Sequence, residues 1–168
     1  VWDIVSSNTN IKKHSGQVSI ELANEPVNIY DADSLESARA PYDFFQPIVD
    51  KIRANGFDGI IWVPGTGWQS NYTCYKSNPI EGYNIGYAVH AYVGWYNNSD
   101  ENANGETFIQ EFGKAVPVVN TNPVIITEVD WSPEKEGEGH YDEHGNWVPA
   151  NWGTWATGST SKWGNAYK

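Results

Sequence analysis

Four short apolar runs constrain the fold of this 168-residue chain more than any other feature, and stretches of helical periodicity lie between the first two and between the last two. The runs lie at residues 18–22, 59–63, 87–93 and 124–128. They have the length of strands, are rich in β-branched residues and are flanked by Gly, Pro or Asn, which favours strands over buried helices. Nearly continuous apolar strands that alternate with helices are typical of an α/β fold, with a parallel sheet covered by helices.

Two helices are expected between these strands. The apolar positions of residues 44–52 recur at helical spacing, and Asn55-Gly56 is a good C-terminal stop. Because proline is disfavoured inside a helix, we expect the main part of this helix to begin close to Pro47. The apolar positions of residues 108–116 predict a second helix, which ends before Pro117.

Two long connections, residues 65–84 and 132–160, contain no clear periodicity and are expected to be loops. Both follow the carboxyl ends of predicted strands, which is where α/β folds place their functional sites. These loops are therefore the segments in which substrate-binding residues are expected.

Charge and aromatic content narrow the class of ligand. The chain has 21 acidic and 10 basic residues, a formal net charge of −11, which disfavours nucleic acid and anionic membrane surfaces as partners. No apolar stretch approaches the roughly 20 residues of a membrane-spanning helix. The aromatic residues are mostly those whose rings carry a polar group, because nine Trp and ten Tyr accompany only five Phe. Some of these rings belong to the core, and others are candidates for stacking on neutral sugar rings.

Polar residues collect where the predicted strands end. Two of them are carboxylates from different strands, as a glycosidase requires, because one carboxyl group protonates the leaving oxygen while the other attacks or activates water. Each residue taken alone is more often a solvated rim residue, a cap or a packing residue. Their joint occurrence at successive strand ends favours an active site, with the two Glu as its catalytic candidates: Asn24, Glu25, His90, Tyr92, Glu128 and Trp131.

Other chemistries are weakly supported. His140 and His144 would face together on a helix, but the glycines around them disfavour a helix, so we expect no metal site there. Cys74 lies in a long connection without the His and Asn pattern of a thiol enzyme. Neither a phosphate-binding Gly loop nor a Gly-x-Ser-x-Gly motif occurs.

Three motifs, in this order, resemble those of glycoside hydrolase family 5, the cellulase family: Asn24-Glu25-Pro26, His90-Ala91-Tyr92 and Ile126-Thr127-Glu128. The resemblance implies part of a (β/α)8 TIM barrel, namely strands four to seven with their helices and long βα loops. It spans nearly the whole chain, so residues 1–168 would be a single partial catalytic domain. A half-barrel exposes two strand edges, and we expect it to need the missing barrel strands or to self-associate.

The same resemblance implies roles for the strand-end residues. Glu25 would be the general acid/base and Glu128 the nucleophile, while Asn24 would hydrogen-bond the sugar 2-hydroxyl. His90 and Tyr92 would orient and tune the two carboxylates. Three tryptophans near the strand ends are the candidate sugar contacts: Trp68, Trp95 and Trp131.

The function expected from these residues is that of a retaining endo-β-1,4-glucanase that works by double displacement on β-glucan, without a metal or organic cofactor. A secreted or cell-surface location is expected with it. Two alternatives stay open: a catalytically silent half-barrel that only binds glucan, and the same chemistry on xyloglucan or mannan. The sequence does not decide which glycan is used, nor between endo and exo action.

Overall fold

The computed structural model describes residues 1–26, 35–92, 94–98, 103–130, 139–149 and 162–167. The chain forms two compact units, one of residues 1–90 and 114–127 and the other of residues 91–113 and 128–168. Among the described helices, none combines the length and the apolar composition that crossing a membrane requires.

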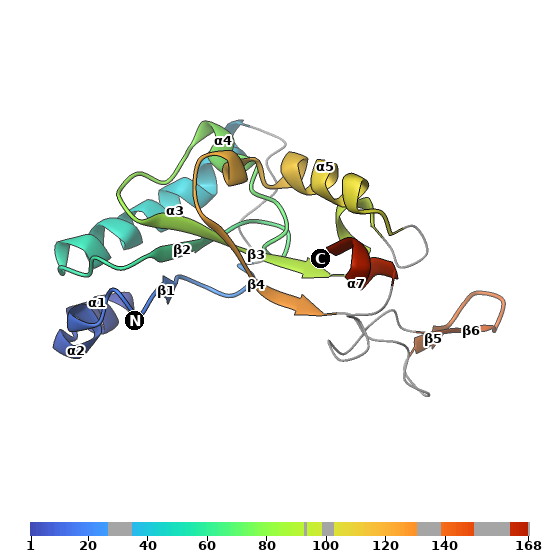
Figure 1. Cartoon of the computed structure of the whole chain (residues 1–168), viewed down its shortest axis with the longest axis horizontal. Helices are drawn as coiled ribbons and strands as arrows, with labels where there is room; N and C mark the ends of the chain where they lie inside the picture. Colours follow the sequence, from blue (N-terminus) through green and yellow to red (C-terminus); the bar gives the residue numbers. More distant parts are fainter. Residues whose placement is uncertain (27–34, 93, 99–102, 131–138, 150–161, 168) are drawn as a thin grey trace. The chain divides into compact units, whose positions relative to one another are not determined.

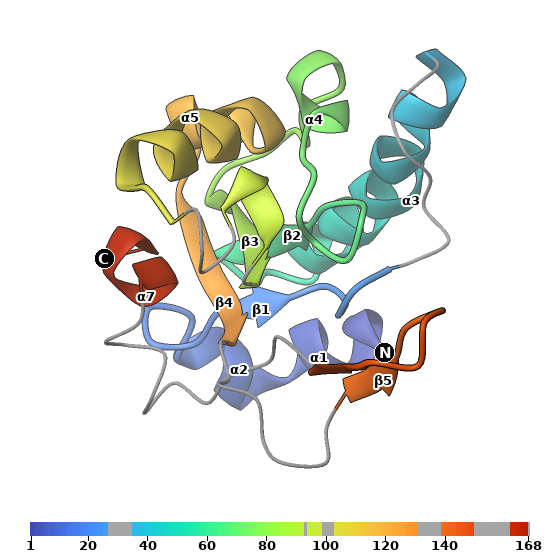
Figure 2. The same cartoon turned by 90° about the vertical axis from the view of Figure 1, so that its right-hand side faces the viewer.

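The first unit contains a four-stranded sheet in the order β1-β2-β3-β4 (Figures 1 and 2). β1 pairs in parallel with β2, and β2 pairs in parallel with β3, with Ile20, Ile61 and Ile85 in register. β3 and β4 continue into the second unit. The four predicted strands and the α/β class are confirmed, and the strand bounds are β1 (Ile20–Glu21), β2 (Ile61–Pro64), β3 (Ile85–Tyr92) and β4 (Val124–Asp130).

Helix α3 (Leu35–Ala54) runs alongside the sheet (Figure 2) and is longer than the sequence predicts. It contains Pro41 and Pro47, so the expectation that the helix begins close to Pro47 is wrong. Each internal proline costs about 3 kcal/mol through a lost hydrogen bond and a clash. Burial of an apolar stripe offsets that cost, because side chains such as Phe45 and Ile52 are at most 1% exposed. The helix ends before Asn55-Gly56, as predicted, and Gly56 has a φ of 83°.

The N-terminal helices are fixed to α3 and to the chain after β1. α1 (Trp2–Ser7) and α2 (Thr9–Lys13) meet at Asn8, whose side chain caps α2. The Asn55 side chain donates to the carboxylate of Asp3 at 2.9 Å and to the Ser6 hydroxyl at 2.9 Å. The Trp2 indole donates to the carbonyl oxygen of Leu22 at 2.9 Å, which attaches α1 beyond β1.

The core of the first unit is aromatic as well as aliphatic. The rings of Tyr72, Tyr75 and Tyr87 lie 5.0–6.2 Å apart between centroids, and all three are buried. The Trp62 ring covers Gly86 on the neighbouring strand, where an added Cβ would lie 2.3 Å from a ring carbon. The connection 65–84, predicted as a loop, includes the short helix α4 (Cys74–Ser77), which contributes buried side chains to this core.

The second unit has its own aromatic cluster. Tyr96, Phe108, Phe112 and Tyr167 pack with ring centroids 5.1–5.8 Å apart. They come from three elements: η1 (Trp95–Asn97), α5 (Gly105–Ala115) and α7 (Lys162–Tyr167). α5 confirms the second predicted helix. Its last two residues belong to the first unit, and the 3-10 turn η2 (Pro117–Asn120) follows it.

Residues 139–149 of the connection 132–160 form regular secondary structure, which corrects the prediction of a loop there. β5 (Gly139–Tyr141) and β6 (Trp147–Pro149) form an antiparallel hairpin. The Asp142 carboxylate closes the turn by accepting from the amides of His144 at 2.9 Å and Asn146 at 2.8 Å. These strands are too short for periodicity to reveal, and Asp-to-amide turn bonds stabilise such a hairpin locally.

Replacement of the fully buried Ile52 of α3 by Ala should lower the free energy of unfolding by about 2–5 kcal/mol, because it opens a cavity in the core. The matched change Ile4→Ala on α1, where the side chain is 79% exposed, should stay within about 0.5 kcal/mol. Urea denaturation followed by circular dichroism measures both. Equal losses would contradict the described core.

Stability should fall at alkaline pH because of buried phenols. Burial raises the pKa of Tyr87 to about 12, whereas an unfolded tyrosine has a pKa of about 10. The folded state therefore holds this proton more tightly, so the contribution to stability is complete below about pH 10 and is lost as the pH rises toward about 12. Tyr87→Phe should flatten this loss in denaturation midpoints measured from pH 9 to 12. The control Tyr141→Phe, at a 69% exposed site, should leave the slope unchanged.

Candidate active site

In the first unit, polar residues lie just beyond the carboxyl end of β1 and near that of β3. Asn24 is exposed, and the neighbouring Glu25 is half-buried with a φ of 44°, in the left-handed region. His90, the sixth residue of β3, is 1% exposed. A non-glycine residue in the left-handed region costs energy and is commonest at functional sites. The strand ends that the sequence singles out therefore include one strained acidic residue.

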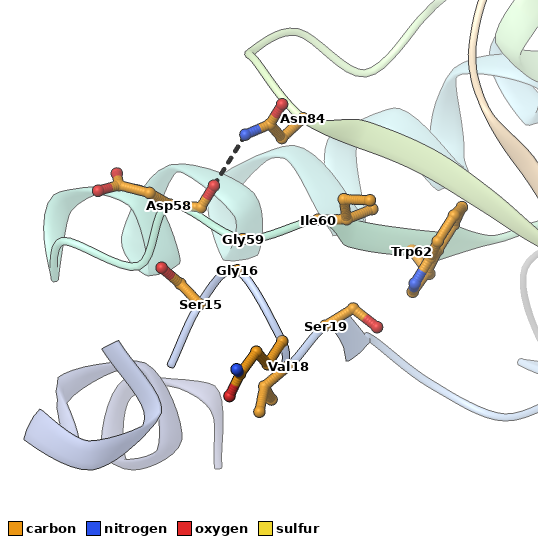
Figure 3. Close-up of a pocket in the computed structure, with 10 residues that line it drawn as sticks. Ser15, Gly16, Val18, Ser19, Asp58, Gly59, Ile60, Trp62 and Asn84 are labelled. Atoms are coloured by element: carbon orange, nitrogen blue, oxygen red, sulfur yellow. Dashed lines mark hydrogen bonds between the residues drawn. The ribbon is translucent and has the colours of Figure 1, made fainter. Parts of the chain in front are cut away.

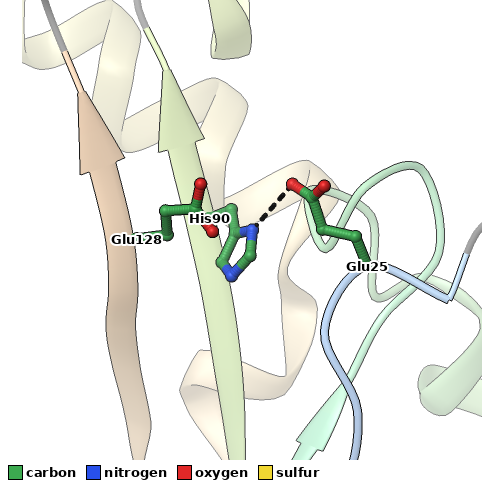
Figure 4. Close-up of side chains that lie close together, drawn as sticks. All are labelled: Glu25, His90 and Glu128. Atoms are coloured by element: carbon green, nitrogen blue, oxygen red, sulfur yellow. Dashed lines mark hydrogen bonds and ion pairs between the residues drawn. The ribbon is translucent and has the colours of Figure 1, made fainter.

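Glu25 and His90 form a hydrogen-bonded pair. The Nδ1 atom of His90 lies 2.9 Å from the Oε1 atom of Glu25, as Figure 4 shows. The Glu25 side chain is 27% exposed, whereas the imidazole is buried. An ionised carboxylate only accepts hydrogen bonds, so the pair requires that Nδ1 carries a proton when Glu25 is ionised. The ring thus holds one carboxylate oxygen and leaves the carboxyl group accessible to solvent.

In the second unit, Tyr92 and Glu128 form another pair. The Tyr92 hydroxyl donates to the Oε1 atom of Glu128, which lies on β4 (Figure 4 shows the strand). The Tyr92 ring packs against Trp95, with centroids 5.0 Å apart and an angle of 58° between the rings. Both predicted carboxylates therefore have a hydrogen-bonded partner, and both partners come from the predicted His90-Ala91-Tyr92 motif.

The loop after β2 contains a left-handed turn. Gly67, Trp68 and Gln69 have φ values of 54°, 52° and 59°. For the two non-glycine residues this conformation costs roughly 1–2 kcal/mol each. The turn sends the two side chains in different directions, because Trp68 is 58% exposed whereas Gln69 is completely buried. Trp68 is thus presented to solvent as a predicted sugar platform should be.

Gln69 is a residue of this region that the sequence reasoning missed. Its Oε1 atom accepts a hydrogen bond from the backbone amide of Glu25 at 2.6 Å. Its Nε2 atom donates to the Glu21 carboxylate at 3.0 Å and to the carbonyl oxygen of Ala88 at 3.1 Å. Its own carbonyl oxygen accepts from the amide of His90 at 2.9 Å. A lone Gln after Trp68 forms no motif, so only the folded chain reveals these contacts.

The remaining predicted residues contribute less. Trp95 is half-buried in η1, and Trp131 lies outside the described residues. His140 lies in β5 and His144 in the following turn, so the helix that a pair of metal ligands four residues apart would need is not formed. The exposed His144 ring lies 3.6 Å from the carboxylate of Glu143.

A pocket of about 490 Å³ lies at the opposite end of the strands of the first unit (Figure 3). It is lined by residues that precede β1, β2 and β3, such as Ser15, Asp58 and Asn84, together with Trp62. The Asn84 side chain donates to the carbonyl oxygen of Asp58 at 2.8 Å within it. Because α/β folds place their sites at the carboxyl ends of strands, this pocket is not the predicted site.

A comparison with family profiles identifies one family. The profile described as Cellulase (glycosyl hydrolase family 5) matches residues 5–165. An endoglucanase of Halalkalibacter akibai is 28% identical over 157 residues, which cover 81% of this chain and 19% of that protein. The chain therefore spans about a fifth of the length of this curated relative.

Solved structures show the same fold. The β-glucanase SdGluc5_26A of Saccharophagus degradans superposes with a TM-score of 0.62 at 23% identity, covering 86% of this chain and 42% of that one. The catalytic domain of the Thermobifida fusca endoglucanase Cel5A superposes with a TM-score of 0.53 at 22% identity, covering 85% and 43%. The expected partial (β/α)8 barrel is thereby confirmed.

The Glu25–His90 hydrogen bond should be visible in solution. Proton NMR at neutral pH should show a downfield, slowly exchanging Nδ1 proton for the buried His90, because the carboxylate accepts it at 2.9 Å. Glu25→Ala should remove or strongly shift this resonance. Glu143→Ala, at a side chain that is 87% exposed, should leave it in place. A resonance that is unchanged in Glu25→Ala would contradict the pair.

Proposed function

Because the chain belongs to the cellulase family of glycosyl hydrolases, family 5, we propose that it supplies the two catalytic carboxylates of a retaining endo-β-1,4-glucanase. The chain spans 42–43% of the structurally similar chains and 19% of the curated relative, so the proposal concerns the protein that uses these residues as a whole. Glu25 is the general acid/base in this proposal, and Glu128 is the nucleophile.

The observation that carries the proposal is the separate pairing of the two carboxylates. Glu25 contacts an imidazole, and Glu128 accepts from a phenol. The partners, His90 and Tyr92, are the sixth and the eighth residues of β3. An acid and a nucleophile need different surroundings, since one must exchange a proton while the other stays ionised.

The first step forms a glycosyl-enzyme. An oxygen of Glu128 attacks C1 of the sugar, the bond from C1 to the glycosidic oxygen breaks, and the proton of Glu25 passes to the leaving oxygen. The Tyr92 hydroxyl donates to Glu128 and so orients the attacking carboxylate. Glu25 leaves this step as a carboxylate, which His90 Nδ1 can hold as a hydrogen-bond donor.

The second step releases the sugar. Water attacks C1, its proton returns to Glu25, and the bond from C1 to Glu128 breaks, so both carboxyl groups are restored. Two displacements at C1 give net retention of configuration. The exposed Asn24 beside Glu25 is the proposed partner of the sugar 2-hydroxyl.

A β-glucan substrate is supported by the relatives. The curated relative is named an endoglucanase, and both the S. degradans β-glucanase and a form of the T. fusca endoglucanase were solved in complex with cellotetraose. In this chain, Trp68 offers an exposed indole face, on which the C–H groups of a glucose ring can pack. Trp95 and Trp131 are proposed as further contacts. Since the substrate is a polymer, we also propose that the protein acts outside the cell.

Replacement of either proposed catalytic residue should abolish hydrolysis without abolishing binding. Glu25→Ala should lower kcat on cello-oligosaccharides by about 10²–10⁴-fold through loss of acid catalysis, and Glu128→Ala by at least roughly 10³-fold through loss of the nucleophile. Azide should rescue the two variants with products of opposite anomeric configuration, which NMR distinguishes. Glu143→Ala is the matched control and should keep full activity.

Assays of the unmodified protein distinguish an enzyme from a catalytically silent protein that only binds glucan. Reducing-sugar release and glucan binding are followed on the same unmodified protein, as it is naturally produced. Binding without any release of reducing sugar would favour the glucan-binding half-barrel. Hydrolysis of xyloglucan or mannan in preference to β-1,4-glucan would change the proposed substrate but keep the two carboxylates.

A further inference from the structure

The side-chain amide of Gln69 can have only one orientation. Its Oε1 atom faces the N–H group of Glu25, whereas its Nε2 atom faces two acceptors, the Glu21 carboxylate and the Ala88 carbonyl oxygen. A flipped amide would place its NH₂ group against the Glu25 N–H group and its oxygen against both acceptors. The Gln69 amide therefore accepts one hydrogen bond through its oxygen and donates two through its N–H groups. These three bonds fix its orientation.

This amide stabilises a strained backbone. Glu25 has a φ of 44°, in the left-handed region, where a non-glycine residue costs of order 1–3 kcal/mol and persists only if its surroundings hold it. The hydrogen bond from the backbone amide of Glu25 to the Oε1 atom of Gln69 is 2.6 Å long and partly buried. Such a bond constrains the backbone from which the Glu25 carboxyl group projects.

The same residue also holds the partner of Glu25. The carbonyl oxygen of Gln69 accepts from the backbone amide of His90 at 2.9 Å. Glu25 and His90 are 65 residues apart in the sequence and come from different strand ends. One residue thus bonds to the main chain of both members of the pair, and its own position is set by the left-handed turn.

We infer that Gln69 is a positioning residue, which sets the place of the Glu25 carboxyl group for proton transfer by fixing the backbones of Glu25 and His90. This inference rests on the proposed function of Glu25 as the general acid/base. Gln69 is 0% exposed and so does not touch substrate itself. Because a misplaced acid loses catalysis much faster than it loses substrate binding, the residue should act on kcat rather than on KM.

The test uses the near-isosteric variant Gln69→Met, which removes all three side-chain hydrogen bonds. Gln46→Met is the matched control, because Gln46 is also a buried amide whose oxygen accepts from the Glu81 amide at 2.7 Å and whose nitrogen donates to Asp50 and to the Glu81 carbonyl oxygen. Both variants lose the same kinds of bond within the first unit. Only Gln69→Met alters the bonds to Glu25.

Two substrates separate positioning from general damage. Cellotetraose needs a proton on its leaving oxygen, whereas the leaving group of 2,4-dinitrophenyl β-cellobioside departs without one. With the protein as it is naturally produced, Gln69→Met should lower kcat on cellotetraose by about 10–100-fold, with KM within about twofold. It should change kcat/KM on the dinitrophenyl substrate by less than about threefold. Gln46→Met should affect both substrates equally.

A loss in Gln69→Met that is equal on the two substrates would overturn the inference. If the unmodified protein hydrolyses neither substrate, the proposed function fails instead, and the positioning is then read from the His90 Nδ1 proton resonance. That resonance should shift in Gln69→Met and stay in place in Gln46→Met; an unshifted resonance would overturn the inference.

A measurement without any substitution covers the case in which Gln69→Met does not fold. Hydrogen exchange followed by NMR should show the Glu25 amide proton protected by at least about tenfold relative to an unstructured chain, because Gln69 Oε1 accepts it. Exchange of the Glu25 amide at the rate of an unstructured chain would show that the bond to Gln69 is absent, and the inference would be wrong.

Discussion

The parallel register of β1, β2 and β3 is the constraint on which the rest of the described site depends. Ile20, Ile61 and Ile85 lie in line across the three strands, so the chain leaves all three at the same edge. The loop after β2, the middle strand, is then flanked by the chain after β1 and by the end of β3. For this reason a single loop residue, Gln69, reaches the backbones of both Glu25 and His90.

Those parts of the molecule whose physical cause is local could be predicted from the sequence. β3 is buried in seven of its eight positions, and all of these except His90 hold aliphatic, aromatic or glycine residues, as buried parallel strands require. The acidic residues at the ends of the apolar runs are equally visible in the sequence, although β4 continues past Glu128 to Asp130. Glu25 and Glu128 were singled out as candidates in this way, and each has a hydrogen-bonded partner in the His90-Ala91-Tyr92 motif.

Features that depend on distant contacts were missed. The early start of α3 depends on burial that offsets two internal prolines, and a local rule about proline cannot include this burial. The β5–β6 hairpin depends on the Asp142 turn, and its strands are too short to have a period. Gln69 has no neighbouring motif, and its four contacts come from segments 19 to 48 residues away.

The left-handed turn at Gly67–Gln69 has a consequence for how such a site can diverge. Two consecutive residues of the turn have opposite surroundings: the Trp68 side chain is 58% exposed to solvent, whereas Gln69 is 0% exposed and lies in the interior. A substitution of the outer residue can therefore change the exposed surface of the loop, while the inner residue keeps its bonds to the backbones of Glu25 and His90. The surface that the loop presents to solvent and the support of the Glu25–His90 pair are thus encoded in adjacent residues, so the first can vary while the second is conserved.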